Sequence, residues 1–218
     1  MKKIIALVFF CLLSLSCTKE LLLNTTEVTM FSLDKHIITS DGTNVSFSSQ
    51  NPYVASVNET TGQVTAIHVG ETYIDVVADQ GTSRVKVNVV AQYREITDPI
   101  IDWNATKEEI KALVNMPTAA ENTTGLSYVY GDIRNGDTHI GTVYMFGTDG
   151  TLDNIIVAYN PLHLLSVVKH LSERYQYYIE NDGQYMFGNA IDAADADTHL
   201  LITEISEVTC IFYYNPNK

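Results

Sequence analysis

The sequence predicts two domains of different class: an all-β sandwich over residues 25–91 and an α+β domain over residues 103–218. The first third contains short alternating strands separated by Gly, Asn and Asp turns, a spacing typical of sandwiches. The remainder contains two segments with helical apolar spacing and N-terminal capping signals. Between them lie Asn-Gly and Asp-Gly turns, which favour hairpins. At 218 residues the chain is long enough for two ordinary domains.

The N-terminus has the features of a secretory signal over residues 1–16. Lys2 and Lys3 precede an apolar run that is too short to span a bilayer, and small residues follow it. Cys17 comes next, and the junction resembles the lipobox of bacterial lipoproteins. That resemblance implies acylation of Cys17, a tether over residues 17–24, and export to the cell envelope. By resemblance to envelope lipoproteins, Thr18 rather than Asp directly after the cysteine implies the outer membrane, facing either the periplasm or the cell surface.

The net charge of the chain limits the classes of partner that it can bind. Without Lys2 and Lys3 the chain has 11 basic and 26 acidic residues, a net charge of −15. It has no basic cluster for nucleic acid or for anionic headgroups, so membrane attachment is expected through the lipid at Cys17. Cys210 has no expected partner for a disulfide, and its apolar neighbours predict a packed, unreactive thiol.

Six strands are expected in the first domain, each bounded by turn residues. They are residues 28–33, 45–47, 54–57, 63–67, 72–78 and 83–90.

Three linked blocks in this domain carry a family resemblance. They are Ser48-Ser49-Gln50-Asn51-Pro52-Tyr53-Val54-Ala55-Ser56-Val57, then Gly62-Gln63-Val64-Thr65-Ala66, then Val69-Gly70-Glu71-Thr72. The pattern resembles the bacterial Ig-like domain, group 2. The resemblance implies an Ig-like β-sandwich, a role in adhesion or as a spacer on the cell surface, and no catalytic residues. Gly62 and Gly70 are expected at turns with positive φ. The short stretch before Phe47 predicts that one strand is lost or reduced.

Residues 92–102 are predicted to be a linker, and Trp103 is expected to anchor the second core. The second domain is predicted as helix, three strands, helix, three strands, with a possible internal duplication. Thr106 and Glu109 form a capping box for the first helix, and Pro117 ends it. Asn160-Pro161 opens the second helix, whose apolar stripe is Leu164, Val168, Leu171, Tyr175 and Tyr178. The expected strands are residues 126–133, 140–146, 152–159, 184–187, 199–205 and 208–214.

No motif for catalysis, for a metal or for a cofactor is found in the sequence. His163 and His170 are seven residues apart, whereas zinc sites use closer pairs with a carboxylate. The acidic run over residues 192–197 lacks the Gly and distal Glu of a calcium loop. We therefore expect no catalytic residue, no metal ligand and no cofactor.

Tyrosines are the strongest candidates for ligand binding. Aromatic side chains with polar tips suit stacking against sugars or peptides. They equally suit cross-strand pairs on the solvent face of an antiparallel sheet, and we favour this structural interpretation over ligand binding. The candidates are Tyr128, Tyr130, Tyr144, Tyr213 and Tyr214.

Three functions follow from these observations. The first is a non-catalytic envelope lipoprotein that acts in adhesion, interaction or scaffolding. The second is a surface lipoprotein that binds a glycan or peptide on its tyrosine-bearing sheet. The third is an envelope enzyme or enzyme inhibitor, which would need converging carboxylates in a cleft.

Overall fold

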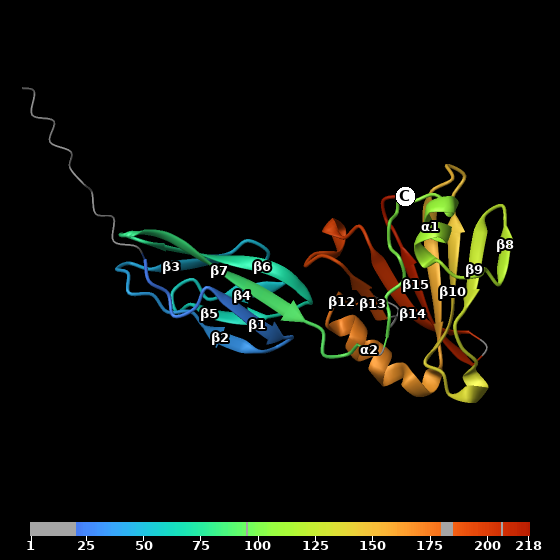
Figure 1. Cartoon of the computed structure of the whole chain (residues 1–218), viewed down its shortest axis with the longest axis horizontal. Coiled ribbons are helices and arrows are strands. Elements are labelled where there is room, and N and C mark those ends of the chain that lie inside the picture. The colour runs from blue at the N-terminus through green and yellow to red at the C-terminus, as the bar shows by residue number, and fades with distance from the viewer. Residues whose placement is uncertain (1–20, 95, 180–184, 206) are drawn as a thin grey trace, which may run out of the picture.

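The computed structural model describes residues 21–94, 96–179, 185–205 and 207–218. The predicted signal peptide and Cys17 lie outside the described residues. The chain forms an N-terminal domain of two β-sheets and a C-terminal domain with an eight-stranded antiparallel sheet and two helices (Figure 1). This confirms the predicted fold class.

The first domain packs a four-stranded sheet, in the order β1-β7-β6-β3, against a three-stranded sheet, in the order β2-β5-β4. β1 pairs with β7 in parallel, and the other pairs are antiparallel. The strands are β1 (Glu27–Phe31), β2 (Lys35–Ile37), β3 (Ser46–Ser49), β4 (Ala55–Val57), β5 (Gln63–Ala66), β6 (Gly70–Ala78) and β7 (Gly81–Val90).

The sandwich core comes from alternate residues of the long strands. Ile74 of β6 lies opposite Val85 of β7, and these two side chains are fully buried together with Val76 and Val87 of the same strands. Gly62 has φ 68°, as predicted, and a Cβ there would lie 2.3 Å from the Ile38 carbonyl oxygen. Only glycine fits this turn.

The first domain begins earlier than the sequence predicted. Leu21 is buried in the sandwich core, and Leu23 forms a β-bridge with Ser40. The predicted tether over residues 17–24 is therefore corrected at its end, because residues 21–24 belong to the folded domain. The predicted reduced strand corresponds to β2, which has three residues.

The second domain has eight strands and two helices. The elements are α1 (Lys107–Val114), β8 (Ala120–Asn122), β9 (Gly125–Val129), β10 (His139–Phe146), β11 (Leu152–Tyr159), α2 (Leu164–Ser172), β12 (Gln176–Ile179), β13 (Tyr185–Gly188), β14 (His199–Ile205) and β15 (Val208–Tyr214). The sheet order is β12-β13-β14-β15-β11-β10-β9-β8. Both helices contribute to a single core cluster, so they cover the same face of the sheet (Figure 1).

The predicted order of helix and three strands, repeated, is wrong by one strand in each half. β8 was not predicted, because its Ala-Glu-Asn sequence has low strand propensity and all three side chains are exposed. β12 was assigned to the second helix. That helix ends at Ser172, and Tyr178 pairs with Met186 of β13 instead. Each half is therefore one helix followed by four strands.

The two halves meet symmetrically. β11 and β15, the last strand of each half, pair antiparallel from Asn154↔Tyr214 to Tyr159↔Thr209. The order of elements is therefore the same in both halves, and the internal duplication stays a prediction.

The predicted helix signals are largely confirmed. Thr106 and Glu109 form the capping box, and the Thr106 N–H and hydroxyl both lower the pKa of the Glu109 carboxyl. Helix α1 ends at Val114, before Pro117, and its C-cap residue Asn115 adopts a left-handed conformation with φ 50°. The Asn160 side chain accepts a hydrogen bond from the Leu162 N–H at the start of a 3₁₀ turn that leads into α2.

Hydrogen bonds connect the two domains at their junction. The Tyr53 hydroxyl donates to the Arg174 carbonyl oxygen at 2.6 Å, and the Val69 N–H donates to the Glu173 carbonyl oxygen at 2.6 Å. His68 stacks on Tyr53 with ring centroids 4.2 Å apart. Burial lowers the pKa of His68, so the neutral imidazole is favoured here.

The segment predicted as a linker, residues 92–102, packs against the second domain. The Glu173 side chain is only 5% exposed, and its carboxylate accepts hydrogen bonds from the main-chain N–H groups of Gln92 and Tyr93, each at 3.0 Å. Ile96 is buried in the second core. Trp103 is buried and its indole N–H donates to Thr198, which confirms it as an anchor.

Candidate functional site

Three of the five tyrosines predicted to contact a ligand lie in the core. Tyr128, Tyr144 and Tyr213 are at most 1% exposed, and they lie on the face of the sheet that the helices cover. Tyr128 and Tyr144 make an edge-to-face pair at 6.0 Å. Burial raises the pKa of Tyr144 to about 12. The expectation that these three face solvent is corrected: they lie in the core, and none of them lines the groove described below.

The other two tyrosines reach solvent, but in different places. Tyr130 follows β9, is 41% exposed and stacks on His139 at 4.2 Å. Tyr214 lies on the opposite face of the sheet, where its ring packs edge-on to His199 at 5.4 Å. The structure therefore does not bring the five tyrosines together into one site.

The face of the sheet away from the helices, here called the open face, is unusually apolar. The register places Val143, Ile156, Phe212 and Leu201 side by side across β10, β11, β15 and β14. Val143 is 36% exposed, and the other three are half-buried. An antiparallel sheet that faces water normally places polar side chains there. We call these four residues the open-face row.

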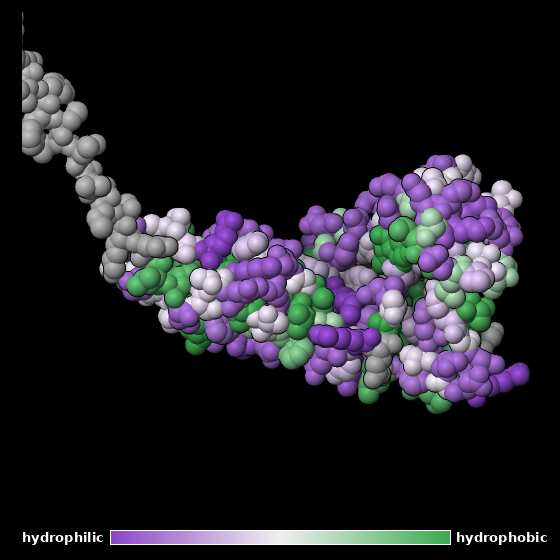
Figure 2. All heavy atoms as spheres, viewed as in Figure 1, coloured by the Kyte–Doolittle hydropathy of each residue, from purple (hydrophilic) through white to green (hydrophobic). Residues whose placement is uncertain are grey.

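The rows beside it also lack charge. One flanking row is Gly141, Ala158, Cys210 and Thr203, and the other is Met145, Asn154, Tyr214 and His199. None of these described positions is Asp, Glu, Lys or Arg, although charged residues make up 18% of the chain. Figure 2, which views the molecule as Figure 1 does, shows hydrophilic residues over most of the visible surface. Depletion of charge is the compositional mark of an interface core.

Cys210 lies in one of these flanking rows. Its thiol is free and buried, as predicted, and burial raises the pKa of that thiol. Within the described residues no group of three or more His, Cys, Asp or Glu side chains is placed to hold a metal ion.

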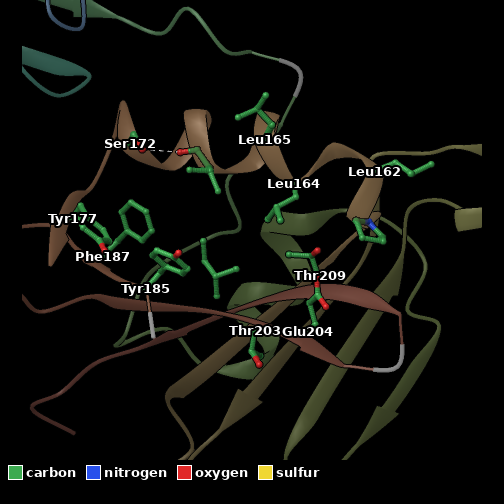
Figure 3. A pocket seen from close by; sticks show the side chains of 13 residues that line it. Leu162, Leu164, Leu165, Ser172, Tyr177, Tyr185, Phe187, Thr203, Glu204 and Thr209 are labelled. Carbon is green, nitrogen blue, oxygen red and sulfur yellow. Dashed lines mark hydrogen bonds between the residues drawn. The ribbon is translucent and has the colours of Figure 1, made fainter. Parts of the chain in front are cut away.

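A second surface lies on the helix side of the sheet. Between α2 and strands β12 to β15 runs a cavity of about 1160 Å³, here called the α2 groove (Figure 3). Leu164, Leu165 and Val168 of α2 line one wall. Tyr177 and Phe187 lie opposite with ring centroids 5.4 Å apart.

Neither surface was predicted from the sequence. The open-face row depends on the register between four strands that are distant in the chain, so a single sequence gives little signal for it. The groove had a partial signal in Tyr177 and Tyr185. Both are exposed, at 43% and 60%, and both lie in segments with strand-forming residues.

Comparison with known proteins identifies the first domain. Residues 28–89 match the model of the bacterial Ig-like domain (group 2) family, and the match covers the strands of the sandwich described above. No functionally curated protein matches the chain.

Three solved structures of the S-layer protein SbsC show weak similarity. Domains 5–6 share 13% identity over 90% of this chain and 83% of that chain, with a TM-score of 0.30. Domains 4–9 share 14% identity over 91% and 27%, and domains 1–6 share 13% over 90% and 21%, each with a TM-score of 0.29. Similarity at this level carries no information about function.

Within the described residues no helix is long and apolar enough to cross a membrane.

Proposed function

We propose that this chain is an exported, non-catalytic interaction protein of the cell envelope, held to the membrane by a lipid on Cys17. The Ig-like domain holds the second domain away from the bilayer, and the open face of the second domain binds a partner protein. The observation that carries the proposal is the open-face row, four apolar side chains aligned across central strands on the side of the sheet away from α1 and α2.

The chemistry of the open face favours a protein partner over a glycan. Sugars are held by several hydrogen-bonding groups around a stacking aromatic ring, whereas the open-face row offers aliphatic side chains and Phe212. Burial of such a row gains roughly 25 cal/mol for each Å² of apolar surface that leaves water. The absence of charged side chains from these rows fits the core of a protein interface.

Site-specific photocrosslinking tests the open face in living cells. With a benzoylphenylalanine in place of Phe212, we expect a discrete crosslinked product. The same probe in place of Leu113, which is 60% exposed on α1, should not yield that product. Adding Val143→Asp should abolish the Phe212 product, because it places a charge in the apolar row. A product that survives Val143→Asp, or that forms equally from position 113, would contradict the proposed interface.

Metabolic labelling tests the anchor separately. Cells that express the chain are given a radioactive fatty acid, and the protein is recovered from membrane and soluble fractions. We expect label on the membrane-bound wild type. In the Cys17→Ser variant both the label and membrane retention should disappear, since the acceptor thiol is gone. An unlabelled wild type, or a labelled Cys17→Ser variant, would remove the anchor from the proposal.

A further inference from the structure

The α2 groove exists because the core-facing side of the sheet extends beyond helix α2. Leu200, Ile202 and Glu204 alternate along β14 and share that side. Leu200 is fully buried in the core beneath the helices, whereas Glu204 is exposed. Along this side of β14 the side chains therefore change from a buried leucine in the core to an exposed carboxylate at the edge of the groove.

The floor of the groove contains a hydroxyl without a partner. Thr209 lies directly opposite Glu204 in the β14–β15 pair and lines the groove (Figure 3). It is 0% exposed, and within the described residues its Oγ1 has no hydrogen-bond partner. A buried polar group left unsatisfied costs about 1–3 kcal/mol, so a ligand that supplies the missing bond relieves a cost already present.

Glu204 sets the charge that the groove accepts. It is the only charged residue among the described residues that line the groove, and its carboxylate has no ion pair in that part of the chain. The chain as a whole is acidic, with a net charge of −13. A carboxylate at this position repels fatty-acid and lipid-phosphate headgroups and attracts an ammonium or guanidinium group.

The size and walls of the groove fit a chain segment. Its volume of about 1160 Å³ lies above the 300–1,000 Å³ typical of pockets for one small ligand. Leu164 and Leu165 on α2, with Tyr177 and Phe187 on the sheet, present apolar surface along both sides. Apolar side chains of an extended peptide can occupy this space while its main chain supplies hydrogen-bonding groups.

We propose that the α2 groove binds an extended segment of another protein that carries apolar side chains and one Lys or Arg. The basic group lies at Glu204, and a polar main-chain group of the segment bonds to the Thr209 hydroxyl. This site is on the opposite side of the sheet from the open face, so its ligand binding can be tested independently of the function proposed above.

The charge preference is tested with synthetic peptides and the full-length protein. Fluorescent nonapeptides rich in Leu and Phe carry one Lys, and matched peptides carry Gln or Glu at that position. By fluorescence anisotropy at low ionic strength, the Lys peptide should bind tightest. Glu204→Gln should weaken the Lys peptide about two- to fivefold and remove the discrimination. Glu207→Gln, which changes a nearby acid outside the groove, should leave affinity unchanged.

The hydroxyl is tested with Thr209→Val, which keeps the shape of the side chain. We expect about two- to tenfold weaker binding of the Lys peptide, with urea stability of the free protein unchanged or increased, because the hydroxyl has no internal partner to lose. The proposal is overturned if the three peptides bind equally, or if the preference for Lys persists in Glu204→Gln. It is also overturned if Thr209→Val leaves binding unchanged. A third contrary result is that sodium dodecanoate displaces the Lys peptide better from wild type than from Glu204→Gln, because Glu204 should repel that carboxylate.

Discussion

Ile110→Ala should destabilise the second domain by roughly 2–5 kcal/mol, the cost of truncating a fully buried aliphatic side chain. Ile110 is 0% exposed and is the one residue of α1 that is buried in the described core. Its loss leaves a cavity under a helix of only eight residues, which has little other packing to retain it. Urea unfolding followed by circular dichroism measures the change as a lower midpoint at constant slope.

Leu113→Ala on the same helix is the matched control for this prediction. Leu113 is 60% exposed, so its truncation should change the free energy of unfolding by no more than about 0.5 kcal/mol. If the two substitutions have equal effects, Ile110 does not attach α1 to the core as the structure describes.

Glu173→Ala should cost roughly 1–3 kcal/mol and should loosen the junction between the domains. The substitution leaves the main-chain N–H groups of Gln92 and Tyr93 without their acceptor in a partly buried position. A donor orphaned in a fully buried position costs about 1–3 kcal/mol, and water reaches the exposed Gln92, so the two losses do not add in full. It also removes the carboxylate that lies 3.6 Å from the Arg174 guanidinium. Hydrogen exchange reports the change directly, because the amides of Gln92 and Tyr93 should exchange faster.

Two further variants make the Glu173 result specific. Glu173→Gln keeps one acceptor oxygen and should lose less stability than the alanine variant. Glu59→Ala removes an exposed carboxylate of the Ig-like domain and should be close to neutral. Unchanged exchange at Gln92 and Tyr93 in Glu173→Ala would show that the carboxylate does not hold the interdomain segment.

The sequence was most informative where local chemistry determines the structure. The turn at Gly62 and the capping box of Thr106 and Glu109 each depend on a few neighbouring residues, and both are present as predicted. The misassigned strand β12 shows the opposite case. Tyr175 and Tyr178 continue the helical spacing of Leu171, and only pairing with β13 makes that segment extended.

The candidate sites were harder to predict, because each depends on which side of the sheet the helices cover. Ile155, Ile156 and Val157 of β11 are apolar on both sides, so alternation does not reveal the covered face. Tyr128 and Tyr144 were for this reason expected at the surface, although they lie in the core. Glu204 could have been noticed from the sequence. It points to the same side of its strand as Leu200 and Ile202, both of which are apolar.

The burial of Leu21 has a geometric consequence for the whole molecule. Four Cα steps separate it from Cys17, which limits the span between them to about 15 Å. With Cys17 acylated as proposed, the Ig-like domain rests almost on the headgroups, with little freedom to swing. The height and tilt of the second domain's sheet above the bilayer are then set by the Tyr53–Arg174 contact between the domains rather than by a flexible tether.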